Sequence, residues 1–367
     1  MTLTQFREPT VATLRQRWRG PVIDSDVHVV VPGLDALLPY LDEVWHEVAR
    51  ERGWRGASSE RPYPVGSPAY ARPEWRPADG RAPASSFELL RQQLLDVIEP
   101  EYAILNCSYL VDSGNPDISV ALARAVNDWI RAEWLDQDPR LRASILLPTW
   151  ADPRAMVAEI ERVSADPRFV QAQLPVRSGM LYGKRLYWPV FEAIERAGLV
   201  AGIHWGGSNH GIQPTQSGWA SRYIEEYVGE IGVYESQLIS VIGEGLFQHC
   251  PTLRVTMMDI GFAWVPMWVW DMDRNWKAMR REIPWIKQSP FALVRDHVRF
   301  TSAPLDADSS EELAEIMSWL GSDEVVLFAT DYPHTHDDDP AVLLSALSDS
   351  AQNSVMADNA RRWYGLQ

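Results

Sequence analysis

The sequence predicts a (β/α)8 TIM barrel, and three observations support that fold class. Eight short apolar runs, each of a length typical of a buried strand, follow one another along the 367 residues. Segments with the spacing of amphipathic helices lie between most of these runs, an alternation typical of parallel βα units. Carboxylate, imidazole and amide side chains recur in these runs, mostly near one end, and active sites of such barrels lie at the strand ends.

Each element is assigned from its own pattern. We expect helices at 118–135, 153–164, 188–198, 223–249, 265–282 and 309–320, with two short helical segments in 341–363. The predicted strands are PVIDSDVHVVV (21–31), EYAILNCS (101–108), RASILLPTW (142–150), RFVQAQLPV (168–176), GLVAGIHW (198–205), LRVTMMDIG (253–261), HVRFTSAPL (297–305) and EVVLFATDYPH (324–334).

Two regions interrupt the alternation. Residues 1–20 are expected to form an N-terminal arm, and residues 21–367 a single barrel domain. Residues 33–100 are far longer than an ordinary βα loop and contain a stretch rich in Pro, Gly, Ser and Arg. Because this insertion follows the first strand, we expect it to cover the C-terminal face of the barrel as a lid or a partner contact.

Composition excludes several classes of function. The net charge of −16 disfavours nucleic-acid binding, since an acidic surface repels phosphates. No apolar stretch is long enough to span a membrane. The two cysteines, Cys107 and Cys250, each lie beside an apolar run and are expected to be buried and reduced, which indicates a cytoplasmic protein.

Four residues on three predicted strands suggest a metal centre. Asp26 and His28 are two positions apart, so they share one face of the first strand. His204 ends the fifth run, and Asp331 lies near the end of the eighth. Two imidazoles and two carboxylates suit a divalent ion, zinc first, with manganese or iron as alternatives. The other interpretation is a polar barrel mouth that holds no metal.

The pieces IDSDVH, GIHWGG, DIGFAWVP and FATDYPH resemble the amidohydrolase superfamily, in the branch of aminocarboxymuconate-semialdehyde decarboxylase and related aromatic-acid decarboxylases and hydrolases. The resemblance implies that Asp26 and His28 replace the usual first His-x-His motif. It also implies that His204 and Asp331 are the later ligands. Gln173 stands where binuclear members carry a bridging lysine, so no carbamylated lysine is expected.

One position departs from this branch. Decarboxylases of the branch that this chain resembles carry a histidine on strand six. This chain has Asp259 at that position. We expect Asp331 or Asp259 to accept a proton from metal-bound water. The enzyme would then be a hydrolase or non-oxidative decarboxylase of a small organic acid, amide or lactone. His334 is a further catalytic candidate because it follows Asp331 in the family-like sequence DYPH.

The remaining polar residues leave alternatives open. Substrate contacts are expected from Trp205, His210, Gln173 and His336, whereas the acids at 337–339 with Pro340 are typical of a helix N-cap. Asp259, His334 and His336 could hold a second ion, as in dinuclear Fe/Fe or Mn/Fe oxygenases of the same fold. With 17 tryptophans, the chain is also expected to form a homo-oligomer. A non-catalytic subunit paired with a homologous chain is a third interpretation.

Overall fold

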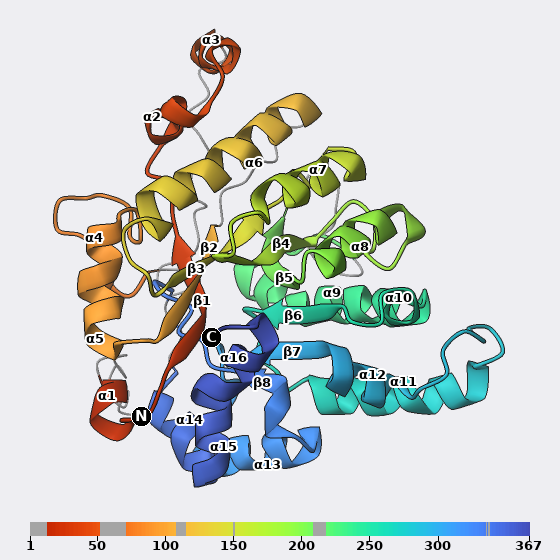
Figure 1. Cartoon of the computed structure of the whole chain (residues 1–367). Coiled ribbons are helices and arrows are strands. Elements are labelled where there is room, and N and C mark those ends of the chain that lie inside the picture. The colour runs from red at the N-terminus through yellow and green to blue at the C-terminus, as the bar shows by residue number, and fades with distance from the viewer. Residues whose placement is uncertain are drawn as a thin grey trace.

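Eight parallel strands surround the centre of the molecule in sequence order, with helices outside them (Figure 1). The computed structural model describes residues 13–51, 71–107, 115–149, 151–207, 218–334, 336 and 338–367. The predicted (β/α)8 barrel is confirmed. Its strands are β1 (Ile23–Val29), β2 (Tyr102–Cys107), β3 (Leu141–Leu146), β4 (Phe169–Arg177), β5 (Val200–Gly207), β6 (Arg254–Met258), β7 (Val298–Thr301) and β8 (Val326–Leu327).

The barrel closes through the segment that follows β8 rather than through β8 itself. The Ser25 amide donates to the Phe328 carbonyl at 2.9 Å, and the His28 amide donates to the Tyr332 carbonyl at 2.7 Å. Asp331 lies between these contacts and donates its amide to the Asp26 carbonyl at 3.1 Å. The eighth strand, Val326–Leu327, is shorter than the predicted 324–334, and the backbone after it turns at Asp331, where φ is 51°. This seam places Asp331 beside Asp26 and His28.

The predicted helices are present with adjusted bounds. The segment 223–249 is divided at Gly245, whose φ of 87° is the left-handed conformation that glycine favours at a helix end. Asp339 accepts a hydrogen bond from the Ala341 amide at 2.8 Å and caps the helix that Pro340 begins. The main helices after β2 are α6 (Pro116–Ile130), α7 (Pro153–Val163), α8 (Trp188–Arg196), α9 (Tyr223–Gly243), α10 (Leu246–His249), α11 (Val265–Met279), α12 (Pro290–His297), α13 (Ser310–Leu320), α14 (Pro340–Ala346), α15 (Asp349–Asn353) and α16 (Asn359–Tyr364).

The insertion between β1 and β2 contains short helices and a segment that returns to the barrel. Figure 1 shows α2 (Leu34–Leu37) and α3 (Glu43–Glu51) projecting away from the strands. The Arg72 amide donates to the Pro333 carbonyl at 3.0 Å, and the Val30 amide donates to the Ala84 carbonyl at 2.9 Å. Residues 71–84 thus reach the end of the barrel where β1 and the segment after β8 emerge. Two helices, α4 (Phe87–Leu90) and α5 (Asp96–Ile98), then lead into β2.

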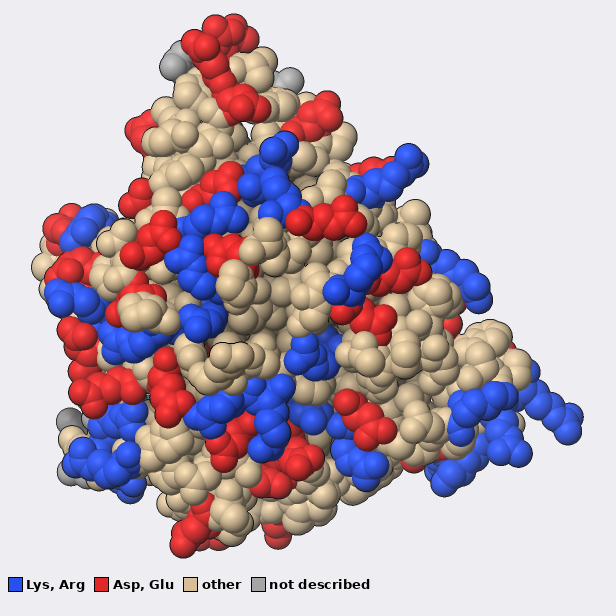
Figure 2. Space-filling model, in the orientation of Figure 1, with Lys and Arg blue, Asp and Glu red and all other residues tan. Residues whose placement is uncertain are grey.

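The opposite end of the barrel is covered by α16, which lies near the centre of the view in Figure 1. The Trp363 indole donates to Thr256 Oγ1 at 3.0 Å, and the Tyr102 hydroxyl donates to the Gln367 carbonyl at 2.8 Å. Acidic and basic side chains are interspersed over this face (Figure 2). Within the described ranges, no helix is both long and apolar enough to cross a membrane.

A buried asparagine joins α6 to β3 and α7. Asn127 Nδ2 donates to the Leu146 carbonyl at 2.9 Å and to Glu159 Oε1 at 2.7 Å, and Asn127 Oδ1 accepts from the Leu146 amide at 2.8 Å. We expect Asn127→Ala to lower the free energy of unfolding by about 3 kcal/mol, because several buried polar groups lose their partners. Urea denaturation measures this loss. The exposed Asn275→Ala is the control and should change stability by less than about 0.5 kcal/mol; equal effects would contradict the prediction.

Candidate metal centre

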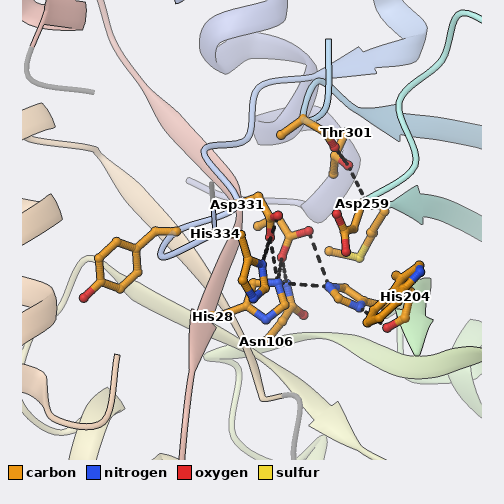
Figure 3. A network of polar contacts seen from close by, with 12 residues as sticks. His28, Asn106, His204, Asp259, Thr301, Asp331 and His334 are labelled. Atoms are coloured by element: carbon orange, nitrogen blue, oxygen red, sulfur yellow. Dashed lines mark hydrogen bonds and ion pairs between the residues drawn. The ribbon is translucent and has the colours of Figure 1, made fainter. Parts of the chain in front are cut away.

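Four predicted ligands meet inside the barrel, and Figure 3 labels three of them, His28, His204 and Asp331. His28 Nε2 lies 3.2 Å from His204 Nε2 and 2.8 Å from Asp331 Oδ1. The two oxygens of Asp26 each lie 3.6 Å from one of these histidines, Oδ1 from His28 Nε2 and Oδ2 from His204 Nε2. All four side chains are buried. Donor atoms from β1, β5 and the segment after β8 are therefore close enough to share one ion.

The local backbone explains this convergence. The pairing of β1 with β2 shifts register between Asp24 and Val27, beside Asp26, and such irregularities re-aim side chains. Asp259 and Asp331 follow β6 and β8 with φ values of 59° and 51°. Non-glycine residues rarely adopt this conformation, and it is concentrated at functional sites. Both carboxylates are thus turned out of the strand direction at the same end of the barrel.

The donor set fits a divalent cation. The ring of His204 donates from Nδ1 to the Trp205 carbonyl at 2.7 Å, which leaves the lone pair of Nε2 directed at the cluster. Asp26 Oδ2 is buried without a hydrogen-bond partner among the described residues. Two nitrogens about 2.1 Å from one ion would lie roughly 3.0–3.4 Å apart at ordinary coordination angles. The observed separation of 3.2 Å between His28 and His204 falls in that range.

The charges of the site also favour a cation. Burial alone would lower the pKa of His204, but the Asp26 carboxylate raises it to about 9. Burial would likewise lower the pKa of His336, and the hydrogen bond to Asp331 raises it to about 9. Although burial opposes its ionised form, Asp331 has a pKa well below its usual range because of His334 and His28. The carboxylates therefore stabilise positive charge here, which is the electrostatic requirement of a metal site.

Asp331 is shared with a second group of potential ligands. His336 Nε2 lies 2.5 Å from Asp331 Oδ2 and 3.7 Å from Asp259 Oδ1. His334 Nδ1 lies 3.0 Å from both oxygens of Asp331. Burial and the charge of Asp331 raise the pKa of Asp259. Three overlapping sets have metal-binding spacing: Asp26, His28, His204; His28, Asp331, His334; and Asp259, Asp331, His336.

Of the predicted substrate contacts, His336 lies within this centre, against Asp331, and the other three are less closely tied to it. Trp205 supplies its carbonyl to His204, and its half-buried ring packs against the core. Gln173 lies in the middle of β4, which continues to Arg177. Its side chain is buried, and Oε1 has no hydrogen-bond partner among the described residues. His210 lies outside the described residues, and its role stays a prediction.

One polar neighbour of the centre was not assigned a role from the sequence. Asn106 Nδ2 donates to Asp26 Oδ1 at 2.8 Å (Figure 3). Asn106 is paired with His28 in the β1–β2 register, one strand away from the ligands. The available signal was an amide inside an otherwise apolar run. Its partner could not be named without the register of the two strands.

Comparison with known proteins agrees with this arrangement. The sequence family described as amidohydrolase matches residues 23–366, a span that includes every strand and every ligand candidate. The chain belongs to the amidohydrolase family. No functionally curated protein matches this amidohydrolase in sequence.

Several solved structures share the fold of this amidohydrolase. The 2,6-dihydroxybenzoate decarboxylase from Rhizobium is 17% identical, with a TM-score of 0.69 and coverage of 95% of this chain and 99% of that one. The 5-carboxyvanillate decarboxylase from Sphingomonas paucimobilis is 21% identical, with a TM-score of 0.68 and the same coverage. A dihydroxybenzoic acid decarboxylase from Polaromonas, solved with manganese and the inhibitor 2-nitroresorcinol, is 17% identical, with a TM-score of 0.67 and coverage of 95% and 98%.

These comparisons sharpen two predictions about the amidohydrolase. The superfamily is confirmed, whereas membership of the aminocarboxymuconate-semialdehyde decarboxylase branch stays a prediction. The initial preference for zinc gains no support, since manganese is the ion present in the Polaromonas structure. For this chain, the structure supports a cluster of buried histidines and aspartates with metal-binding spacing.

Proposed function

We propose that this amidohydrolase is a divalent-metal-dependent, non-oxidative decarboxylase of a small aromatic acid. The observation that carries the proposal is the buried convergence of His28, His204, Asp26 and Asp331 around a position suited to one cation. Similar structures described as decarboxylases of hydroxylated benzoates supply the reaction class. Manganese is the proposed ion, with zinc and iron as alternatives.

Different residues of this chain would bind the ion and deliver the proton. When bound, the ion would supply Lewis-acid chemistry that polarises the substrate. His28, His204, Asp26 and Asp331 would hold it. Loss of carbon dioxide breaks a C–C bond, leaves the electron pair on the ring carbon and requires a proton there. Asp259 is proposed to deliver that proton, because it stands at the same end of the barrel and pairs with His336 rather than with His28 or His204.

The remaining neighbours would hold the proton carriers in place. His334 and His336 both contact Asp331, which fixes this carboxylate between the two groups of ligands. Asp259 is oriented in turn by its amide, which donates to Thr301 Oγ1 at 3.1 Å. Trp205 is proposed to form an apolar wall for an aromatic ring. In this arrangement Asp259 would be the side chain that supplies the proton to the ring carbon.

Metal removal and reloading tests the proposal. We expect protein prepared without a chelating tag to contain about one ion per chain, to lose activity on dialysis against a chelator, and to recover it with Mn²⁺. Activity would be read as carbon dioxide released from a panel of hydroxybenzoates, with parallel assays of amide and lactone hydrolysis. Less than about 0.1 ion per chain after reconstitution would contradict the metal site. Turnover confined to amides or lactones would replace decarboxylation by hydrolysis.

A second candidate function rests on the Asp259, Asp331 and His336 group. Because Asp331 belongs to this group and to the first, two ions could be held side by side, as a dinuclear oxygenase requires. That function predicts two iron or manganese ions per chain and oxygen consumption that depends on substrate. Carbon dioxide release without oxygen, from protein that holds one ion, would contradict it.

A further inference from the structure

We infer that four buried side chains below the metal centre, Asn106, Ser144, Gln171 and Tyr364, position Asp26 as a metal ligand. This inference rests on the metal site of the proposed function and is independent of the reaction catalysed there. The four residues, called here the interior chain, come from β2, β3, β4 and α16. They lead from the end of the barrel that α16 covers to the end that carries the metal centre.

The interior chain is continuous. Asn106 Nδ2 donates to Asp26 Oδ1 at 2.8 Å, and Ser144 Oγ donates to Asn106 Oδ1 at 2.6 Å. Gln171 Nε2 donates to Ser144 Oγ at 2.8 Å, and the Tyr364 hydroxyl donates to Gln171 Oε1 at 3.2 Å. All five side chains are buried, with Asn106, Gln171 and Asp26 fully inaccessible. No step of this path depends on bulk water.

The Asp26 carboxylate determines the donor and the acceptor of every hydrogen bond in the interior chain. An ionised carboxylate can only accept, so Asn106 must present its amide nitrogen to Asp26. Its oxygen must then accept from Ser144, whose oxygen accepts from Gln171. Tyr364 completes the order as a donor. All these dipoles therefore point their positive ends toward Asp26, and each hydrogen bond strengthens the next.

The surrounding structure is shaped to accommodate the interior chain. A Cβ atom on Gly202 would lie 2.4 Å from Cδ of Gln171. Only glycine at this position therefore leaves room for the Gln171 amide. Tyr364 is held in place because the preceding residue, Trp363, donates to Thr256 Oγ1 at the end of the barrel that α16 covers. Packing thus constrains Gln171 within the interior chain, and a hydrogen bond of the adjacent residue holds its Tyr364 end.

The consequence concerns the two oxygens of Asp26. Oδ1 is held by Asn106, whereas Oδ2, directed at His204, has no hydrogen-bond partner among the described residues. One oxygen is therefore fixed and the other is left for the cation. Removing the Asn106 amide would free the carboxylate to rotate and would leave Oδ1 without its donor. Neighbours that orient a ligand in this way typically change metal affinity by about 10- to 100-fold.

Manganese affinity, measured by competition with a chromogenic chelator, tests the inference on the full chain. We expect Asn106→Leu to raise the Mn²⁺ dissociation constant by about 10- to 100-fold. Tyr364→Phe should raise it by a smaller factor, because four hydrogen bonds separate that residue from Asp26. Ser144→Ala, a smaller change, provides a second measurement if Asn106→Leu does not fold. The electron paramagnetic resonance spectrum of bound Mn²⁺ should broaden or shift in the same variants.

Asn127→Ala is the matched control, since Asn127 is an equally buried asparagine whose partners lie between β3 and the helices. It should lower the melting temperature without changing the dissociation constant. Folded Asn106→Leu and Ser144→Ala with parental affinity would overturn the inference, as would an equal loss in Asn127→Ala. A parent that binds no Mn²⁺ would overturn both this inference and the proposed function. A parent that binds Mn²⁺ but releases no carbon dioxide would count against the function alone.

Discussion

His204→Ala is expected to abolish retention of the metal ion and to lower kcat/KM by about 10³-fold or more. The reason is that the Nε2 lone pair of His204 faces the cluster while its Nδ1 is committed to the Trp205 carbonyl. Loss of a Lewis acid removes several kcal/mol of transition-state stabilisation, and each 1.4 kcal/mol is about a factor of ten in rate. Elemental analysis after gel filtration and the carbon dioxide assay measure the two effects.

His249→Ala is the matched control. His249 lies partly exposed against Glu192 on the outside of the barrel, 37% accessible, so its loss should leave metal content and turnover unchanged. Imidazole added to His204→Ala should restore part of the metal binding if the position acts only as a ligand. Full metal content in His204→Ala would remove this residue from the ligand set.

Asp259→Asn is expected to lower kcat by about 10²- to 10⁴-fold, the usual contribution of a positioned proton donor. The asparagine keeps the size of the side chain but cannot deliver a proton. Under the decarboxylase proposal, the variant should keep its single ion and its KM, because Asp259 pairs with His336 rather than with the first ligand group. Steady-state kinetics and metal analysis of the same preparation check both expectations.

The metal content of Asp259→Asn also separates the two candidate functions. A dinuclear enzyme would lose one of its two ions, since Asp259 belongs to the second ligand group. Asp296→Asn, on the exposed end of α12 beside Arg295, serves as the surface control. An Asp259→Asn enzyme with parental kcat would exclude Asp259 as the proton donor.

The convergence of four candidate ligands could be predicted because it depends on few physical facts. Parallel strands in a barrel bring their carboxyl ends together, and positions two apart on a strand share a face. Asp26, His28, His204 and Asp331 follow from those facts and from the order of the apolar runs. The cluster formed by these four residues agrees with this reasoning.

Other features depend on register and backbone details that no local pattern encodes. The contact between Asn106 and Asp26 requires the register shift in β1, and Tyr364 reaches Gln171 from the last helix of the chain. The eighth strand is shorter than predicted, and neither its end at Leu327 nor the left-handed turn at Asp331 is visible in an apolar run.

An ion bound at the seam of the barrel would also stabilise the fold. Asp26 and His28 belong to the first strand, and Asp331 to the segment after the last, so an ion held by all three would cross-link the two ends of the fold. Binding to the folded state alone stabilises it by RT ln(1 + [L]/Kd), which is about 2.7 kcal/mol when the ion concentration is 100 times Kd. The proposed ion would thus also hold the barrel closed, and its removal would destabilise the seam between β1 and the segment after β8.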